Sequence, residues 1–247
     1  MCATPGSAVN ATSNRETPLR SDSIRLIPFL LLAALTATTA SAQTSVAASI
    51  YGAFTGTTTG DGTHQSPANQ AGGLFELRHI SNPILGFEGT YSWNRADETY
   101  SAYGYSCPAG LVPCGPSPVS IPANAHEITA DWIPSVHIAN VRPFGVLGAG
   151  LLLDVPAISS TVTTTIGNPP CPSSGCTPVT TTYSTSTSAK AVYVYGAGLD
   201  WGLLPHIGLR LQYRGNLYQA PNLSKLYSST DTFTHTAEPM IGAYFNF

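Results

Sequence analysis

Apolar and polar residues alternate along most of the chain beyond residue 42, with the two-residue period of a β-strand. Segments with this alternation are bounded by Gly, Pro, Asn and Ser, and helical spacing is absent from this region. The pattern therefore predicts an all-β protein. The predicted strands are Ser45–Thr55, Ala71–Ile80, Ile84–Asn94, Ala125–Ile133, Val141–Asp154, Ala189–Leu203, Ile207–Tyr218 and Thr232–Phe247.

The segments that connect these eight strands alternate strictly between long and short, at 15, 3, 30, 7, 34, 3 and 13 residues. The architecture of a soluble β-sandwich does not produce such alternation. A bacterial outer-membrane barrel does, because its periplasmic turns are short and its outer loops are long. We therefore expect an eight-stranded antiparallel up-and-down transmembrane β-barrel with four long outer loops and three short periplasmic turns.

The two faces of the strands agree with this expectation. Leu209, Leu211 and Tyr213 alternate with polar residues in one strand, and the third strand shows the same pattern. In a membrane barrel the apolar face contacts lipid and the polar face lines the lumen. All three Trp residues fall on the apolar face near a strand end, Trp93 beside an outer loop and Trp132 and Trp201 beside inner turns. We expect Tyr218 to join Trp93 in the outer aromatic girdle.

The polar faces bring acids and arginines into the predicted lumen. An eight-stranded barrel is only wide enough for side chains to fill, so we expect these charges to form a lumen ion-pair network rather than line a channel. Arg210 and Arg214 are expected to pair with acids of neighbouring strands, Asp200 being the nearest in sequence. The predicted network comprises Glu76, Arg78, Glu88, Glu127, Asp131, Arg142, Asp200, Arg210 and Arg214.

Composition excludes several other classes. Only 9% of residues are charged, against ~25% in a typical soluble domain. No apolar run approaches the ~18–20 residues that a spanning helix needs, which argues against a helical membrane protein. The chain has no basic cluster, so we expect no nucleic-acid partner.

The first 42 residues have the features of a secretory signal peptide. Arg25 directly precedes a 12-residue apolar run, Leu26 to Ala37, and Ala40-Ser41-Ala42 offers a cleavage site. We expect a signal peptide at 1–42, cleaved after Ala42, followed by an outer-membrane β-barrel domain at 43–247. The true translation start stays open, because the polar stretch before the apolar run is long.

The C-terminal strand ends in Phe247, with Phe245, Ala243 and Ile241 at every second position before it. This pattern resembles the signal by which outer-membrane barrels are recognised for insertion. The whole mature chain is similar to the small eight-stranded outer-membrane β-barrel family that includes the OmpA transmembrane domain, OmpX and the opacity proteins.

The resemblance implies a monomeric protein of the cell outer membrane, structural or adhesive in role and without a cofactor. Its partners would be outer-membrane lipid and lipopolysaccharide, together with the barrel-assembly machinery acting through Phe245 and Phe247. Any extracellular partner would bind the outer loops and is not identified by the sequence.

Two outer loops each contain a pair of cysteines, Cys107 with Cys114 and Cys171 with Cys176. In an exported protein an even number of cysteines predicts disulfides within each loop. Pairing between loops and a four-cysteine zinc site are the alternatives, although the spacing is not the usual C-x2-C of zinc sites. No metal site is expected.

His79-Ile80-Ser81-Asn82 is the sharpest enzymatic candidate, because it is similar to the His-x-Ser-Asn motif of outer-membrane lipid A deacylases. Its predicted place is a tight turn at the periplasmic end, whereas that family has the motif late in the chain. We therefore expect no catalytic residues and a non-enzymatic role in envelope structure or surface interaction. The alternatives are a lipid-modifying enzyme and a narrow transporter of small apolar compounds, which the lumen charges disfavour.

Overall fold

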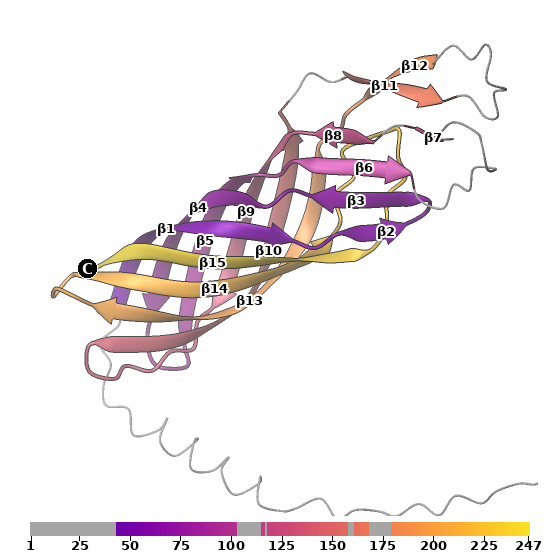
Figure 1. Cartoon of the computed structure of the whole chain (residues 1–247). Coiled ribbons are helices and arrows are strands. Elements are labelled where there is room, and N and C mark those ends of the chain that lie inside the picture. Colours follow the sequence, from indigo (N-terminus) through magenta and orange to yellow (C-terminus); the bar gives the residue numbers. More distant parts are fainter. Residues whose placement is uncertain (1–42, 103–114, 117, 158–160, 168–178) are drawn as a thin grey trace, which may run out of the picture. The chain divides into compact units, whose positions relative to one another are not determined.

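The computed structural model describes residues 43–102, 115–116, 118–157, 161–167 and 179–247. Within these residues eight strands form a closed antiparallel barrel in the order β1-β15-β14-β13-β10-β9-β5-β4, shown in Figure 1. Pairing of β1 with both β15 and β4 closes the ring. The barrel strands are β1 (Gln43–Thr55), β4 (Gln70–Ile80), β5 (Gly86–Arg95), β9 (Ala123–Trp132), β10 (Val141–Pro156), β13 (Ser188–Gly202), β14 (Ile207–Gln219) and β15 (Phe233–Asn246).

The fold prediction is confirmed, with strand ends that differ by up to two residues. Ile84 and Leu85, predicted to begin a strand, belong instead to the turn before β5. There the Asn82 side chain accepts hydrogen bonds from the backbone N–H groups of Ile84 and Leu85. This local bonding keeps the two residues out of the strand.

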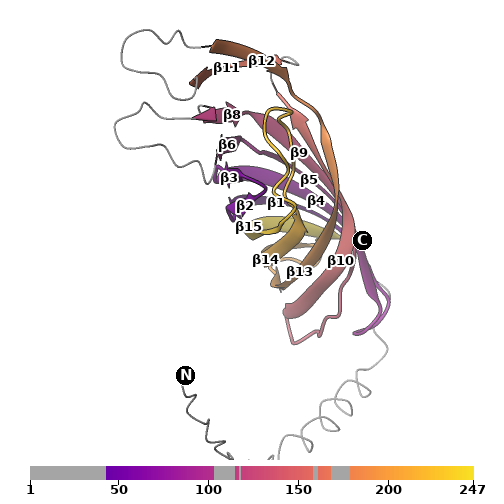
Figure 2. The same cartoon turned by 90° about the vertical axis from the view of Figure 1, so that its right-hand side faces the viewer.

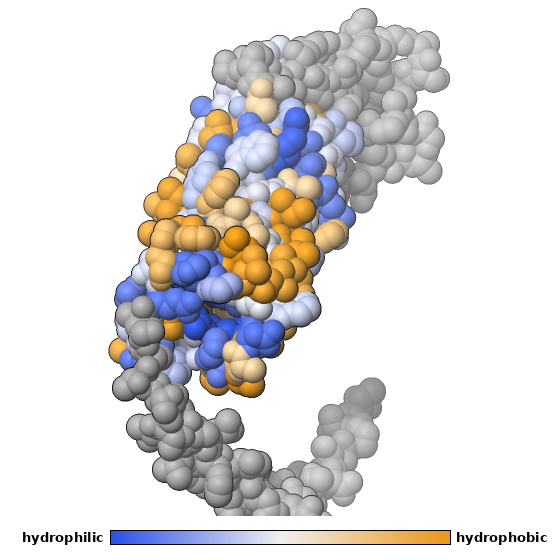
Figure 3. All heavy atoms as spheres, turned by 90° about the vertical axis from the view of Figure 1, so that its left-hand side faces the viewer, coloured by the Kyte–Doolittle hydropathy of each residue, from blue (hydrophilic) through white to orange (hydrophobic). Residues whose placement is uncertain are grey.

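The barrel is inverted relative to a soluble protein. Along β4, Glu76 and Arg78 are 3% and 1% exposed, whereas Phe75 and Leu77 are 62% and 58% exposed. Figure 3 shows apolar side chains gathered in broad patches on the outer surface of the barrel. Apolar surface of this extent needs a lipid environment. Among the described residues, no helix is long and apolar enough to cross a membrane.

The aromatic prediction is correct for tryptophan and wrong for Tyr218. Trp93, Trp132 and Trp201 are exposed on the outer face. Tyr218 is buried, and its hydroxyl lies 2.9 Å from the Thr236 hydroxyl. The alternation of β14 explains this, because Tyr218 has the same parity as the inward residues Arg210 and Arg214.

The two ends of the barrel differ. We call the end with the short turns 81–85, 133–140 and 203–206 the turn end, and the opposite end the loop end. At the loop end, β2 (Thr58–Gly60), β3 (Thr63–Pro67), β6 (Glu98–Ala102) and β8 (Val119–Ile121) form a second sheet, the loop sheet, in the order β2-β3-β6-β8. Figures 1 and 2 show these strands beyond the barrel, away from the C-terminus.

A further sheet is built from β11 (Thr161–Gly167), β12 (Val179–Ser184) and β7 (Gly115–Pro116). The long outer connections therefore contain short strands that were not predicted from the sequence. Threonine-rich segments such as Thr161–Gly167 support this outcome, because β-branched side chains favour the extended backbone.

Candidate functional site

The lumen near the turn end is filled by interlocked charges. Arg78 donates from Nε to Glu88, at 2.5 Å, and from Nη1 to Asp200, at 3.1 Å. Arg210 donates to both oxygens of Asp200, at 2.7 and 3.0 Å, and to Glu76 at 2.5 Å. Both guanidinium groups are fully buried. These five residues, which we call the turn-side layer, come from β4, β5, β13 and β14 and tie strands together across the lumen.

An aromatic ring completes the turn-side layer. The Arg78 guanidinium carbon lies 4.1 Å from the ring centre of Phe144, which points inward from β10. Such stacking stabilises a buried cation. Gly198 on the neighbouring β13 makes room for the ring, since a Cβ at this position would lie 2.3 Å from the Phe144 ring.

A second group of charges, the loop-side layer, is centred on Arg214. Its Nη2 lies 3.0 Å from Glu127 and its Nη1 lies 3.2 Å from Asp131, with further contacts to Thr90 and Thr129. Glu127 and Asp131 belong to β9, which is not adjacent to β14. The expectation of neighbouring-strand partners is thus wrong for Arg214, because the narrow lumen lets its long side chain reach across to β9.

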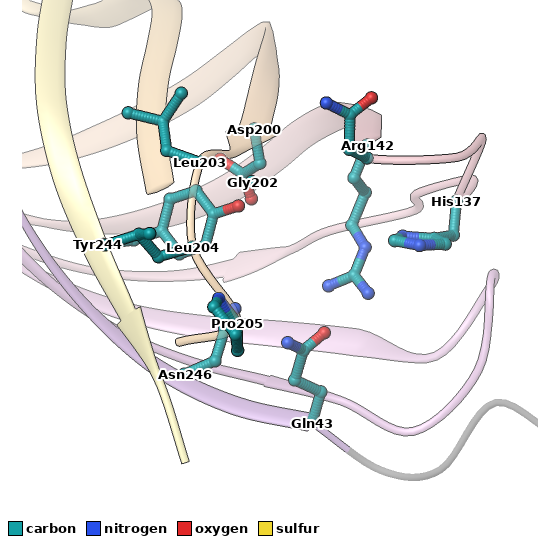
Figure 4. A pocket seen from close by; sticks show the side chains of 11 residues that line it. Gln43, His137, Arg142, Asp200, Gly202, Leu203, Leu204, Pro205, Tyr244 and Asn246 are labelled. Carbon is teal, nitrogen blue, oxygen red and sulfur yellow. The ribbon is translucent and has the colours of Figure 1, made fainter. Parts of the chain in front are cut away.

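Arg142 departs from the predicted network. It forms no ion pair or hydrogen bond with any residue in the described ranges. Its cross-strand partner is Asp200, whose oxygens already accept from Arg210 and Arg78. The Arg142 side chain points instead into the mouth of the barrel at the turn end, as Figure 4 shows.

Two buried acids of the lumen, Glu238 on β15 and Asp154 on β10, were missed from the sequence. Glu238 lies directly opposite Arg214 in the sheet. The alternation along the sequence could have placed Glu238 in the lumen, because it has the parity opposite to the outward residues Ile241 and Phe245. Asp154 likewise shares the parity of the inward Phe144.

Two cavities flank the charged layers. One of about 30 Å³ lies in the loop-end half, lined by Glu127, Asp154 and Glu238 among others. The other, of about 330 Å³, opens at the turn end around Arg142. Between them lie the fully buried side chains of Arg78, Arg210 and Arg214. The described lumen is therefore filled with side chains at mid-depth.

The loop sheet has its own core. Tyr100, Ile121 and Leu223 are buried together, and the Tyr100 hydroxyl donates to the carbonyl of Pro221 at 3.0 Å and accepts from the Leu223 N–H. Glu98 is buried beside them, with Gln65 donating to its carboxyl group at 3.0 Å. Burial raises the pKa of Glu98 to about 8, and the Gln65 hydrogen bond opposes the rise.

The His79 motif does not assemble a nucleophile pair in the structure. The His79 ring faces outward, and its Nδ1 lies 2.9 Å from the Thr44 hydroxyl. Ser81 lies in the turn, where its N–H donates to Leu85. His79 thus lies at the end of β4, and Ser81 lies in the tight turn that the sequence predicted.

The remaining predictions concern the loop cysteines, the signal peptide, the two C-terminal phenylalanines and metal binding. The four loop cysteines and the segment 1–42 lie outside the described residues. Phe245 and Phe247 are exposed and contact each other edge to face, with ring centres 5.3 Å apart. Within the described chain, no group of three or more His, Cys, Asp or Glu is arranged to hold a metal ion.

Comparison with known proteins agrees with this architecture. A family model described as outer membrane protein beta-barrel domain matches residues 27–238. The search of curated proteins found no match.

Several solved structures are similar to the chain. Ail, the attachment invasion locus protein of Yersinia pestis, in complex with the heparin analogue sucrose octasulfate, is 17% identical, covers 84% of this chain and 100% of its own, and has a TM-score of 0.44. The Neisserial surface protein A, NspA, is 15% identical with coverages of 84% and 100% and a TM-score of 0.42. OprG of Pseudomonas aeruginosa is 10% identical with coverages of 84% and 96% and a TM-score of 0.44.

The family match spans most of the chain, and the closed barrel agrees with the β-barrel that the family's description names. The protein is located in the bacterial outer membrane, and the chain belongs to the family of outer-membrane β-barrel domains.

Proposed function

We propose that this protein is a non-enzymatic outer-membrane barrel that serves envelope structure or surface interaction through its loop end. In this arrangement the loop end faces the exterior and the turn end faces the periplasm, as the alternation of long and short connections predicts. The single observation that carries the proposal is the filled lumen. The turn-side and loop-side layers occupy the space that a channel would need.

The loop end supports the surface role. Its strands and the connection between β14 and β15 share a buried core of Tyr100, Ile121 and Leu223, so it presents a folded surface on a rigid scaffold. Binding residues on barrels concentrate on such loops. The experiment therefore compares the two classes of role directly.

The proposal also includes the biogenesis expected from the sequence. We propose cleavage of a signal peptide after Ala42, a monomeric barrel in contact with lipopolysaccharide, and recognition by the assembly machinery through Phe245 and Phe247. Both phenylalanines are exposed at the turn end, where a partner can reach them.

The experiment complements a deletion strain with either the complete protein or a variant whose outer connections are replaced by short turns. These connections are residues 56–69, 96–122, 157–187 and 220–232. An envelope-structural role predicts that both restore resistance to detergent and EDTA. A surface role predicts that only the complete protein restores attachment of the cells to surfaces. Failure of the complete protein to change either property would contradict the proposal.

Lipid A mass spectra from the same strains test the enzymatic alternative. We expect identical acylation with and without the protein. Loss of one acyl chain in the presence of the protein, abolished by His79→Ala, would show that the His79 motif is catalytic and that the proposal is wrong.

A further inference from the structure

The cavity at the turn end combines a cation that has no ion-pair partner among the described residues with several hydrogen-bond donors. Its volume is about 330 Å³, and it is lined by Arg142, His137, Asn140, Tyr244 and Asn246 among others. Figure 4 shows the Arg142 guanidinium directed into this space, with His137 on one side and the Tyr244 hydroxyl facing it from the opposite wall.

Arg142 is the exception among the predicted lumen arginines. Arg78, Arg210 and Arg214 are each held by carboxylates, whereas Arg142 has no hydrogen-bond partner among the described residues. A guanidinium group carries five N–H donors in a planar fork that suits phosphate and carboxylate oxygens. Its free donors therefore favour an anionic ligand.

The acid in the cavity wall is held by other arginines. Asp200 lines the cavity, but its carboxylate is shared by two arginines, with N···O distances of 2.7 Å to Arg210 and 3.1 Å to Arg78. Asp200 therefore attracts Arg142 without forming an ion pair with it. Among the residues that line the cavity, the charged group left with free hydrogen-bond donors is the Arg142 guanidinium.

The rim of the cavity is apolar on its outer side. Leu203 and Leu204 in one turn are 51% and 62% exposed, and Val136 and Ile138 in another turn are 54% and 60% exposed. The exposed ring of Trp201 lies close by in sequence, at the end of β13. Large exposed apolar residues beside a tryptophan are typical of the level of lipid headgroups.

We propose that the turn-end cavity binds a phosphate group, held by Arg142 with support from His137 and the polar side chains of β15. Donors arranged on opposite walls surround a tetrahedral group better than a planar carboxylate. The phosphate comes either from a phospholipid headgroup of the adjoining leaflet or from a free phosphate in the periplasm. This inference rests on the proposed orientation, in which the turn end faces the periplasm, but not on the role of the loop end.

The first test measures binding of inorganic phosphate to the folded protein in detergent micelles by calorimetry. We expect saturable binding to wild type. The affinity of Arg142→Gln for phosphate should be at least about tenfold lower than that of wild type, because a charge-assisted hydrogen-bond donor is lost. Arg95→Gln is the matched control, since Arg95 lies at the other end of the barrel in an exposed pair with Asp97. Acetate binding as tight as phosphate would overturn the assignment to phosphate.

The second test identifies the source of the phosphate. Native mass spectrometry of protein extracted from outer membranes should show a retained phospholipid on wild type and Arg95→Gln but not on Arg142→Gln if a headgroup is the ligand. Binding of inorganic phosphate without retained lipid assigns the site to a free phosphate. Absence of both, or binding that Arg142→Gln leaves unchanged, would overturn the proposal.

Folding of each variant is checked by the heat-dependent shift in gel mobility. Should Arg142→Gln fail to fold, Arg142→Lys and His137→Gln carry the test. Lysine keeps the charge without the planar fork, so we expect phosphate affinity between those of wild type and glutamine. His137→Gln should weaken phosphate binding severalfold, and equal affinity in all these proteins would contradict the site.

Discussion

Asp200 and Arg210 lie directly opposite each other on β13 and β14, and both carboxylate oxygens of Asp200 accept hydrogen bonds from Arg210, at 2.7 and 3.0 Å. The same carboxylate accepts from Arg78 of β4, so one acid joins three strands. A buried ion pair of this kind specifies the geometry of the lumen, and removing one partner leaves an uncompensated charge.

Replacing Arg210 by leucine should therefore lower the free energy of unfolding by about 3–5 kcal/mol, because Glu76 and Asp200 lose their shared cation. Urea unfolding in lipid vesicles measures the change. Arg95→Leu is the control, as Arg95 is half exposed and 3.6 Å from Asp97, and it should cost less than about 1 kcal/mol. Equal costs for the two variants would contradict the role of the network.

Arginine substitutions on the outer face should destabilise the barrel more strongly the closer the residue lies to the middle of the membrane. Leu211 pairs with Leu199 and Ile241 within the apolar band, whereas Leu209 lies beside Trp201 near the turn end. We expect Leu211→Arg to cost about 2–4 kcal/mol and Leu209→Arg clearly less. The same unfolding assay tests this order, and the reverse order would show that the barrel sits at a different depth in the membrane.

Gly198 and Gly89 form a matched pair of glycines in barrel strands. Gly198→Ala places a Cβ 2.3 Å from Phe144 and 2.8 Å from the Leu211 carbonyl, so the ring must leave its position beside Arg78. We expect a loss of about 1–3 kcal/mol. Gly89→Ala meets no atom within 4 Å and should be neutral or slightly stabilising. A neutral Gly198→Ala would show that Phe144 is not packed as described.

The loop sheet should weaken as the pH rises. Burial raises the pKa of Glu98 from 4.5 to about 8, so between these values the folded state holds a proton that the unfolded state has lost. Stability contributed by protonated Glu98 is present at low pH and lost as pH rises through about 8. Amide-exchange protection factors of β3 and β6 measure this trend.

Glu98→Gln should remove that pH dependence, since the amide keeps the shape of the neutral acid and does not titrate. Asp61→Asn is the control, because Asp61 is exposed in the turn between β2 and β3 and asparagine tolerates its positive φ of 44°. A pH slope that persists in Glu98→Gln would assign the effect to another group.

The barrel could be read from the sequence because both of its signals are local. Alternation within a strand and the length of a connection depend only on nearby residues, and the eight strands follow from them. The ion pair Asp200–Arg210 could be predicted for the same reason, because a short turn joins its two strands.

The ion pairs between non-adjacent strands across the lumen could not be predicted from the sequence. Arg214 pairs with acids of β9, and which residues of two non-adjacent strands share a depth depends on the stagger of the whole barrel. The same limit explains Arg142, whose nearest acid is occupied by other arginines. The loop sheet was missed because its strands are short and pair across connections far apart in sequence.

Electrical recording from pure monomer in a planar lipid bilayer tests the central claim most directly. The turn-side and loop-side layers close the lumen at mid-depth with buried Arg78, Arg210 and Arg214. The account predicts no large, long-lived open state under an applied voltage. A steady high conductance from monomer would show that these charges line a water path, and the structural view of the lumen would be wrong.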